Sequence, residues 1–234
     1  MALANSNRFF LEHIEELRVR LVKAGIGFIT ASVLSYLFID KVILFLSRPV
    51  GVLIFTSPAE AFLSRLNLAM FLGMLFSSPY SIFQLWMFVS TGLNEDELRY
   101  AKLFAPWAFV LFVCGGLFAY FIIIPVCIRF LLSFSSDAVV AMISVRNYIS
   151  FVCSFTMIFA AMFQLPLGVM FFSRLGIVTP GMLEEKRRHA IVLMLIVGAL
   201  ITPSDVASQL LVAVPMMCLY EAGIIFSKWI CRKS

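Results

Sequence analysis

Charged residues are scarce in this chain of 234 residues: Asp, Glu, Lys and Arg make up 13% of it, whereas hydrophobic residues make up 62%. Soluble domains carry roughly twice that share of charge, because polar side chains must cover their surface. The composition excludes a soluble globule of this size and predicts an integral membrane protein.

Cysteine pairs and catalytic motifs are also missing. The five cysteines are odd in number, lie in or beside apolar runs, and show neither CxxC spacing nor a histidine at ligand spacing, so we expect neither disulfides nor a zinc site. The sequence contains no HExxH or GxSxG motif, no paired aspartates within an apolar run and no phosphate-binding loop. We therefore expect no enzyme activity and no cofactor.

Long apolar runs are what the chain does have. They are too long and too uniformly apolar for the alternating strands of a barrel, so they predict transmembrane helices. The runs predict an all-α membrane protein forming one domain over residues 1–234, with six spans at approximately 24–39, 66–89, 103–128, 148–172, 190–201 and 206–227.

The fifth run is unusually short. Its twelve residues would reach only about 18 Å, against a hydrocarbon core of about 30 Å. A four-residue break separates it from the sixth run, which predicts a tight hairpin of short fifth and sixth helices with local thinning of the bilayer. In that break Thr202 is a candidate N-cap, Pro203 the first helical residue and Asp205 the third.

Positive charge is distributed unevenly between the two sides. Thirteen of the eighteen Lys and Arg residues lie in the N-terminal tail, the second and fourth breaks and the C-terminal end. The positive-inside rule therefore places both termini in the cytoplasm. Contact with anionic lipid is a sufficient explanation of the net charge of +5, and nothing indicates nucleic acid.

Local signals predict caps and bends. Residues 57–60, Ser-Pro-Ala-Glu, form a capping box with Pro58 at the first helical position, which predicts a short helix before the second span. Single prolines lie in most spans, and each removes a helix hydrogen bond and bends its helix. These are Pro79, Pro106, Pro125, Pro166 and Pro215.

Several segments, in the right order, resemble the TatC family, the multi-spanning receptor subunit of the twin-arginine protein translocase. They are residues 13–21 (HIEELRVRL), 77–80 (SSPY), 84–86 (QLW), 118–121 (FAYF), 163–166 (FQLP), 202–209 (TPSDVASQ), 213–215 (AVP) and 219–221 (LYE). The resemblance covers nearly the whole chain.

The resemblance implies a concave, cup-like arrangement of six helices in the cell inner membrane. It also implies a receptor that binds twin-arginine signal peptides of folded precursors, self-associates in a larger complex and works with TatA-like and TatB-like single-span partners. Transport would be driven by the proton-motive force.

By resemblance, the signal-peptide site involves Glu16 in the tail and Glu97 in the second break, with a surface formed by Arg18, Arg20, Leu21 and Phe88. Paired guanidinium groups call for carboxylates, because the planar fork of arginine binds a carboxylate in bidentate fashion and lysine does not. Two other readings stay open: Glu16 pairs with Arg20 one helical turn away, and Glu97 caps a helix begun at Asn94.

Other residues stand out within or beside the spans. Gln164 occupies a position that is commonly glutamate in the family, and it indicates either a partner or cavity contact or a bond to a carbonyl freed by the nearby Pro166. Glu221 is a candidate polar contact for a partner helix, with snorkelling to the lipid edge as the alternative. The resemblance adds Gln209 and Asp205 to these polar positions, and it assigns structural roles to Pro49, Pro79, Pro166, Pro203 and Pro215.

One residue of the second break departs from the family pattern. Thr91 stands where the family usually has proline in the second break, which leaves the presentation of Glu97 less rigid.

The runner-up interpretation is a secondary transporter for a small solute, suggested by kinked helices and a few intramembrane polar groups. Against it, the two halves show no evident repeat and no cluster of charges at mid-membrane.

Overall fold

A computed structural model describes the backbone of residues 2–55, 57–91, 95–134, 142–174, 176–201 and 206–231, and the side chains within 14–55, 57–88, 104–134, 142–174, 176–200 and 209–229. Within these ranges the chain is helical and contains no strand beyond one isolated bridge between Ile54 and Ser144. The predicted all-α class is confirmed.

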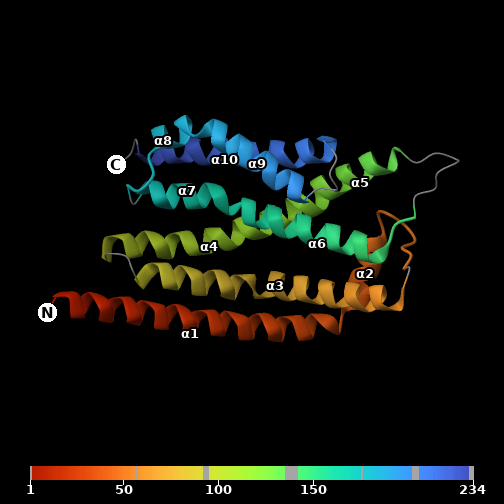
Figure 1. Cartoon of the computed structure of the whole chain (residues 1–234), viewed down its shortest axis with the longest axis horizontal. Coiled ribbons are helices and arrows are strands. Elements are labelled where there is room, and N and C mark those ends of the chain that lie inside the picture. Colours follow the sequence, from red (N-terminus) through yellow and green to blue (C-terminus); the bar gives the residue numbers. More distant parts are fainter. Residues whose placement is uncertain are drawn as a thin grey trace. The chain divides into compact units, whose positions relative to one another are not determined.

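The helices follow the apolar runs (Figure 1). In chain order they are α1 (Ala2–Tyr36), α2 (Ile39–Ser47), α3 (Pro58–Thr91), α4 (Glu95–Phe118), the π-helix η1 (Ala119–Ile123), α5 (Ile124–Leu132), α6 (Val145–Met162), α7 (Gln164–Arg174), α8 (Pro180–Glu185), α9 (Arg187–Ile201) and α10 (Val206–Cys231).

Four stretches of the described residues are long and apolar enough to cross a membrane: Pro58–Phe88, Phe104–Leu132, Val145–Arg174 and Gln209–Trp229. The pair α1 and α2, bent by 74° at a short break, provides a fifth if it is counted as one span. The chain is a multi-pass membrane protein. The helix in the fifth apolar run, α9, has 15 residues and reaches about 22 Å, which is still shorter than the hydrocarbon core.

The helix of the sixth run, α10, is longer than the short helix that we expected. It has 26 residues and reaches about 39 Å. The difference arises because the helix continues past the apolar run, through Lys228 to Cys231. Residues 202–205, with the predicted cap and its Pro203 and Asp205, lie outside the described residues.

The prolines within the spans lie in three different settings. Pro79, Pro106 and Pro215 lie inside continuous helices. Pro125 is the second residue of α5, which directly follows the π-helix η1. Pro166 lies just after the break between α6 and α7.

The capping box at residues 57–60 acts differently from our expectation. Ser57 Oγ does accept from the backbone N of Glu60 at 3.3 Å, but the helix from Pro58 runs unbroken through α3, so no separate short helix exists. The Glu60 carboxylate caps α6 instead of its own helix, accepting from Ser144 Oγ and from the backbone N of Arg146. Because this contact joins residues 84 positions apart, the local motif could not reveal it.

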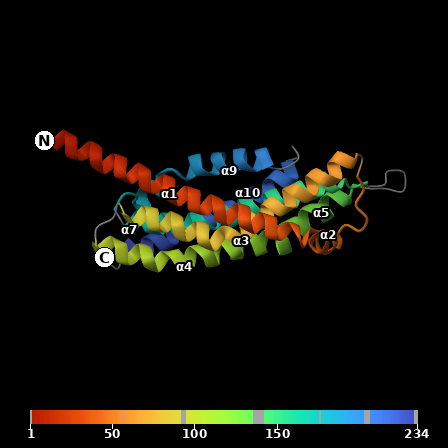
Figure 2. The same ribbon diagram turned by 90° about the horizontal axis from the view of Figure 1, so that it is seen from below.

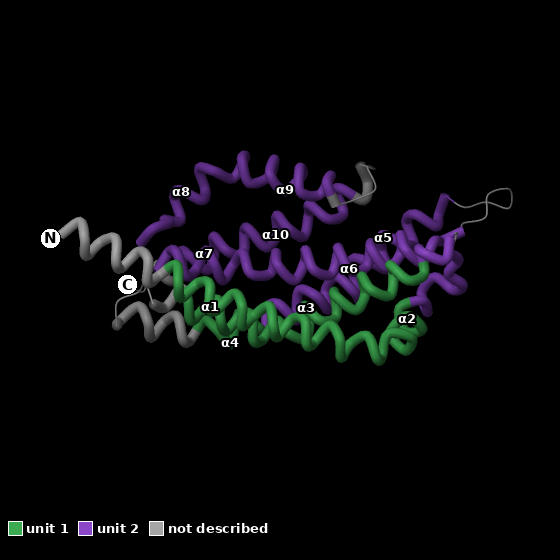
Figure 3. The backbone as a smooth tube through the Cα atoms, turned by 60° about the horizontal axis from the view of Figure 1, so that its bottom comes forward, with its two compact units in different colours: residues 1–46, 61–109 green, residues 47–60, 110–234 purple. Residues whose placement is uncertain are grey.

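The chain divides into two compact units (Figure 3): unit 1 comprises residues 1–46 and 61–109, and unit 2 residues 47–60 and 110–234. Within unit 1, α1 runs alongside α3 (Figures 1 and 2). A Cβ at Gly73 would lie 2.7 Å from Ser32 Cα, so only glycine permits this approach of the two backbones.

Unit 2 has a core of its own. Phe155, Phe159, Val212, Met216 and Ile224 are almost completely buried. A hydrogen bond of 2.6 Å joins the hydroxyl groups of Ser173 and Ser227, which ties α7 to α10 within this core. The cup-like arrangement and the single domain over 1–234 stay predictions.

Candidate functional site

Glu16 is held by a residue of its own helix. The Arg20 guanidinium donates to Glu16 Oε1 through Nε at 3.1 Å and through Nη2, which makes an ion pair one turn apart on α1. The Arg20 side chain is 13% exposed and that of Glu16 is 32% exposed, so the arginine lies underneath and the carboxylate reaches the surface. The i,i+4 pair that we considered as an alternative is therefore present.

The neighbours of this pair on α1 face outward. Arg18 Nη1 lies 3.7 Å from Glu15 Oε1, and both side chains are more than 70% exposed. Leu21 is 70% exposed. An exposed pair of this kind contributes little to stability, so it does not hold the Arg18 side chain in one position.

The end of α3 lies across from this part of α1 within unit 1. Ser32 contacts the Gly73 position and the Tyr80 ring lies against Gly27, so α1 and α3 run antiparallel. Continuing that register places Arg20 at the level of Phe88, a half-buried residue. Helix packing thus brings Glu16, Arg20 and Leu21 toward the end of α3 that leads into the second break.

An aromatic contact joins α4 to this end of α3. The Trp86 and Phe104 rings stack with centroids 6.2 Å apart and planes inclined by 11°. Glu97 lies in the first turn of α4, which begins at Glu95, but its side chain and all of Asn94 lie outside the described residues, as does the side chain of Thr91. The predicted juxtaposition of Glu16 and Glu97 is therefore neither supported nor opposed by a side-chain distance.

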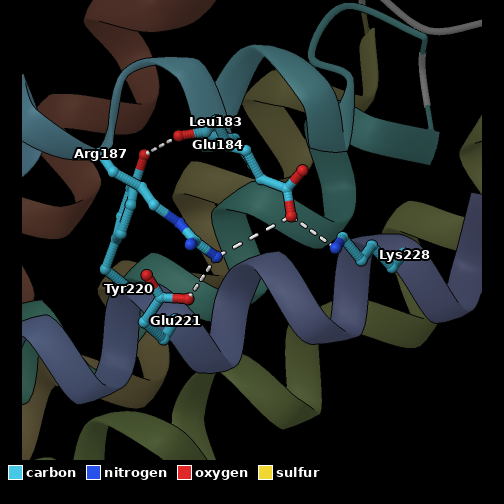
Figure 4. A network of polar contacts seen from close by, with 6 residues as sticks. All are labelled: Leu183, Glu184, Arg187, Tyr220, Glu221 and Lys228. Carbon is cyan, nitrogen blue, oxygen red and sulfur yellow. Dashed lines mark hydrogen bonds and ion pairs between the residues drawn. The ribbon is translucent and has the colours of Figure 1, made fainter.

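A second polar cluster, which we call the α8–α10 network, lies in unit 2 (Figure 4). Arg187 Nη2 lies 2.9 Å from Glu221 Oε2 and 3.8 Å from Glu184 Oε1. Lys228 Nζ lies 2.5 Å from Glu184 Oε1, and Tyr220 donates from its hydroxyl to the Leu183 carbonyl at 2.8 Å. Together these contacts fasten α8 and the start of α9 to α10.

The α8–α10 network pairs two carboxylates, Glu184 and Glu221, with two basic side chains, Arg187 and Lys228. The hydrogen bond from Lys228, helped by the Lys228 and Arg187 charges, lowers the pKa of Glu184 below its usual value. Glu221, predicted as a partner contact, is satisfied within the chain by Arg187 and remains 45% exposed. Its partner role stays a prediction.

Sequence reasoning missed most of the α8–α10 network. It singled out Glu221 alone, although Glu184 and Arg187 are spaced i,i+3 and Glu221 and Lys228 are seven residues apart on one face of α10. That spacing could have predicted that each helix carries an acidic and a basic side chain on one face. It did not reveal which pairs would meet, because α8 and α10 are separated by all of α9.

The remaining predicted positions are distributed over several elements. Gln209 donates from Nε2 to the Leu195 carbonyl at 2.9 Å, which binds α10 to α9. Gln164 is the first residue of α7 and is half-buried, two residues before the buried Pro166. Pro49 lies in the turn that follows α2. Partner roles of Gln164, Gln209 and Asp205 stay predictions.

Comparison with known proteins decides the family. The family model described as "Sec-independent protein translocase protein (TatC)" matches residues 12–215, which is most of the chain. The chain belongs to the TatC family.

Relatives agree with this assignment. TatC of Carboxydothermus hydrogenoformans is 35% identical over 94% of this chain and 92% of its own length. TatCy of Bacillus subtilis is 34% identical, and TatC of Aquifex aeolicus is 33% identical over 95% of both chains. The crystal structure of a twin-arginine translocase receptor, TatC, superposes with a TM-score of 0.86 at 32% identity, covering 93% of this chain and 98% of that one. This TatC-family chain is accordingly a membrane component of twin-arginine protein translocation.

Proposed function

We propose that this TatC-family chain is the receptor subunit that binds twin-arginine signal peptides of folded precursor proteins. Glu16 and Glu97 would supply carboxylates to the two peptide arginines. Arg18, Arg20, Leu21 and Phe88 would shape the surrounding surface. The observation that carries this proposal is the ion pair between Glu16 and Arg20, which holds a carboxylate at the surface of α1 in guanidinium-bound geometry.

The pair supports the proposal because a carboxylate oxygen accepts more than one hydrogen bond. Arg20 donates to Oε1 of Glu16 through both Nε and Nη2. Its aliphatic stem is buried and its position is fixed, so it restricts the rotamers of Glu16 before a ligand arrives. A peptide arginine would then bind a pre-oriented acceptor, while Phe88 and Leu21 would offer apolar surface to the hydrophobic part of the signal.

The direct test is equilibrium binding of the purified, detergent-solubilised protein to a twin-arginine peptide and to the same peptide with both arginines changed to lysine. We expect the lysine peptide to bind at least tenfold more weakly, because a point charge cannot replace a bidentate, charge-assisted contact worth about 1.5–3 kcal/mol. Glu16→Ala and Glu97→Ala should each produce a loss of similar size.

Glu15→Ala is the matched control. Glu15 carries the same charge one position away and is 71% exposed in its pair with Arg18. It should leave peptide affinity within about twofold, because an exposed pair contributes at most about 1 kcal/mol. Equal binding of the two peptides, or an equal loss with Glu15→Ala, would disprove the carboxylate site.

The proposal extends to the assembly. Helices packed about 8–10 Å apart cannot enclose a folded cargo, whose radius of gyration is near 13 Å for a 100-residue domain. TatA-like and TatB-like single-span partners would therefore supply the passage, with several copies of this chain in one complex and the proton-motive force as the energy source. The chain would act without enzyme chemistry of its own.

The placement in the cell is part of the same proposal. We infer the cytoplasmic (inner) membrane, with both termini in the cytoplasm, from the positive-inside distribution of Lys and Arg. This orientation would present Glu16 and Glu97 to precursors before export. Reporter fusions at the two termini test it, and an external reporter at either end would contradict it.

A further inference from the structure

One end of α9 is held to α10 by close packing of the two backbones. A Cβ at Gly198 would lie 3.3 Å from the Gln209 carbonyl oxygen, and Gln209 Nε2 donates to the Leu195 carbonyl at 2.9 Å. Met194, one turn earlier on α9, is buried. This end of α9 is therefore fixed on α10 by an approach of main chains that small residues permit.

The other end of α9, at Arg187, is held in a different way. It is joined to α10 through the α8–α10 network, whose four charged side chains are between 38% and 54% exposed (Figure 4). No side chain of α8 itself is buried. Exposed ion pairs each contribute little and are weakened by salt. Polar contacts, and not a buried apolar side chain of α8, therefore hold this end.

Two breaks in the regular backbone flank α8. Gly176 precedes it with a φ of +71°, a conformation that favours glycine, and a Cβ there would meet nothing within 4 Å. Lys186 separates α8 from α9, with a φ of −88° and a ψ of 7°. Residues at the ends of elements absorb the changes in backbone angle when a segment moves. A short helix between two such breaks can move as a unit once its polar contacts open.

The part of α10 that carries the network is itself firmly packed. The buried Ser227 hydroxyl is hydrogen-bonded to that of Ser173 on α7 at 2.6 Å. A Cβ at Gly223 would lie 3.4 Å from the Cα of Pro166, so the backbones of α7 and α10 are also close here. Opening of the network would therefore displace α8 and the start of α9, while α10 stays in place.

We propose that α8 is a releasable ionic strap, which holds the Arg187 end of α9 on α10, and that α9 pivots about its contact with Gln209 when the strap opens. The strap opens when its charges are screened or removed. A charged ligand at this end of unit 2 would thus change the position of α9. The strap does not depend on signal-peptide binding, because Glu16 belongs to unit 1.

Hydrogen exchange of the full-length protein in detergent, measured by mass spectrometry, tests the opening. We expect the amides of residues 182–190 to exchange about threefold faster in about 1 M than in about 0.05 M NaCl, because salt screens exposed ion pairs. The amides of residues 194–200 should exchange at the same rate in both. Exchange of 182–190 that does not depend on salt would overturn the proposal. An equal acceleration of 194–200 would also overturn it, since α9 would then leave α10 altogether.

Three substitutions separate the ion pairs from the other contacts. Glu221→Gln should raise the low-salt exchange of residues 182–190 to its high-salt value and remove most of the salt dependence. Tyr220→Phe removes an uncharged hydrogen bond, so it should accelerate exchange at both salt concentrations and keep their ratio. Lys186→Gln is the matched control, because it removes a charge between α8 and α9 from a residue outside the network, and it should leave exchange unchanged. An equal loss of salt dependence in Lys186→Gln and Glu221→Gln would overturn the proposal.

A distance measurement tests the pivot. Spin labels on non-natural residues at Ile191 and Ile225, which are 40% and 63% exposed, report the separation of α9 from α10 by pulsed electron paramagnetic resonance. Glu221→Gln should add a longer distance to their distribution. A second pair of labels at the exposed Leu200 and Leu210, near the fixed end of α9, should keep its distance. An unchanged distribution for the first pair, or an equal change in both pairs, would overturn the pivot.

Discussion

At the scale of single residues, acidic side chains in this chain act mainly on distant parts of it. Glu60 caps a helix that begins 85 residues later, and Glu184 and Glu221 join α8 and α9 to α10. Glu15 and Glu16 differ, since their partners Arg18 and Arg20 lie on the same helix. A local pair is predictable from spacing, whereas the distant partners required the fold.

Glu60→Ala tests the first of these contacts. Glu60 is 6% exposed, and its removal would leave the backbone N of Arg146 and the Ser144 hydroxyl without this acceptor. We expect a loss of about 1–3 kcal/mol in the free energy of unfolding, measured by denaturant titration in detergent. Ser133→Ala, at an exposed hydroxyl that only contacts its own helix, should change it by less than about 0.5 kcal/mol.

The Glu184–Lys228 contact should depend on pH. Because the pKa of Glu184 is lowered in the folded protein from an unfolded value near 4.5, its contribution to stability is present above that value and is lost as the pH falls through the folded pKa. The difference in melting temperature between the wild type and Glu184→Gln should be constant from pH 7 to about 6 and vanish in more acid solution. A difference that persists at the lowest pH would contradict this assignment.

At the scale of elements, the apolar runs predicted the transmembrane helices, but not α2 or α8, and not where each helix bends. The run at 24–39 contains no proline, yet α1 ends at Tyr36 and α2 turns away by 74°. Asp40 on α2 pairs with Arg65 on α3 at 2.9 Å, so a contact between helices accompanies the turn. The bend is associated with a contact between helices, which the residues of α1 and α2 alone do not predict.

The packing of α1 on α3 gives a prediction at this scale. A Cβ at Gly73 would lie 2.7 Å from Ser32 Cα, and because that atom belongs to the backbone, the helices must separate. We expect Gly73→Ala to destabilise the protein by about 1–3 kcal/mol in a thermal or denaturant unfolding assay. It should also weaken signal-peptide binding, because the level of Glu16 relative to Phe88 depends on this register.

Gly25→Ala provides the control for that substitution. A Cβ at Gly25, also within a helix, meets nothing within 4 Å. It should be neutral or stabilising by up to about 1 kcal/mol, as alanine favours helix more than glycine does. A comparable loss in both variants would show that glycine flexibility, and not close packing, is required.

At the scale of the whole molecule, the lengths of the spans differ. Four described spans have 21 to 31 residues, whereas α9 has 15 and reaches about 22 Å. The sequence predicted this short helix correctly, because polar residues at Arg188 and Thr202 mark the two ends of its apolar run. It did not predict the full length of α10, since a helix can continue beyond its apolar run.

The short helix predicts a response to membrane thickness. Each ångström of hydrophobic mismatch costs a fraction of a kcal/mol, so we expect the reconstituted protein to have a higher melting temperature in short-chain than in long-chain phosphatidylcholine. Inserting four leucines between Leu195 and Ile196 should reverse or abolish that preference. Identical melting temperatures of the wild type in all thicknesses would contradict local thinning around α9.

The connectivity of the two units limits how the chain can be divided into fragments. Residues 47–60 belong to unit 2, although the chain on both sides of them belongs to unit 1. Neither unit is a contiguous stretch, and a fragment beginning at residue 110 would lack Glu60, the carboxylate that caps α6. No single cut in the chain can therefore separate the two units intact.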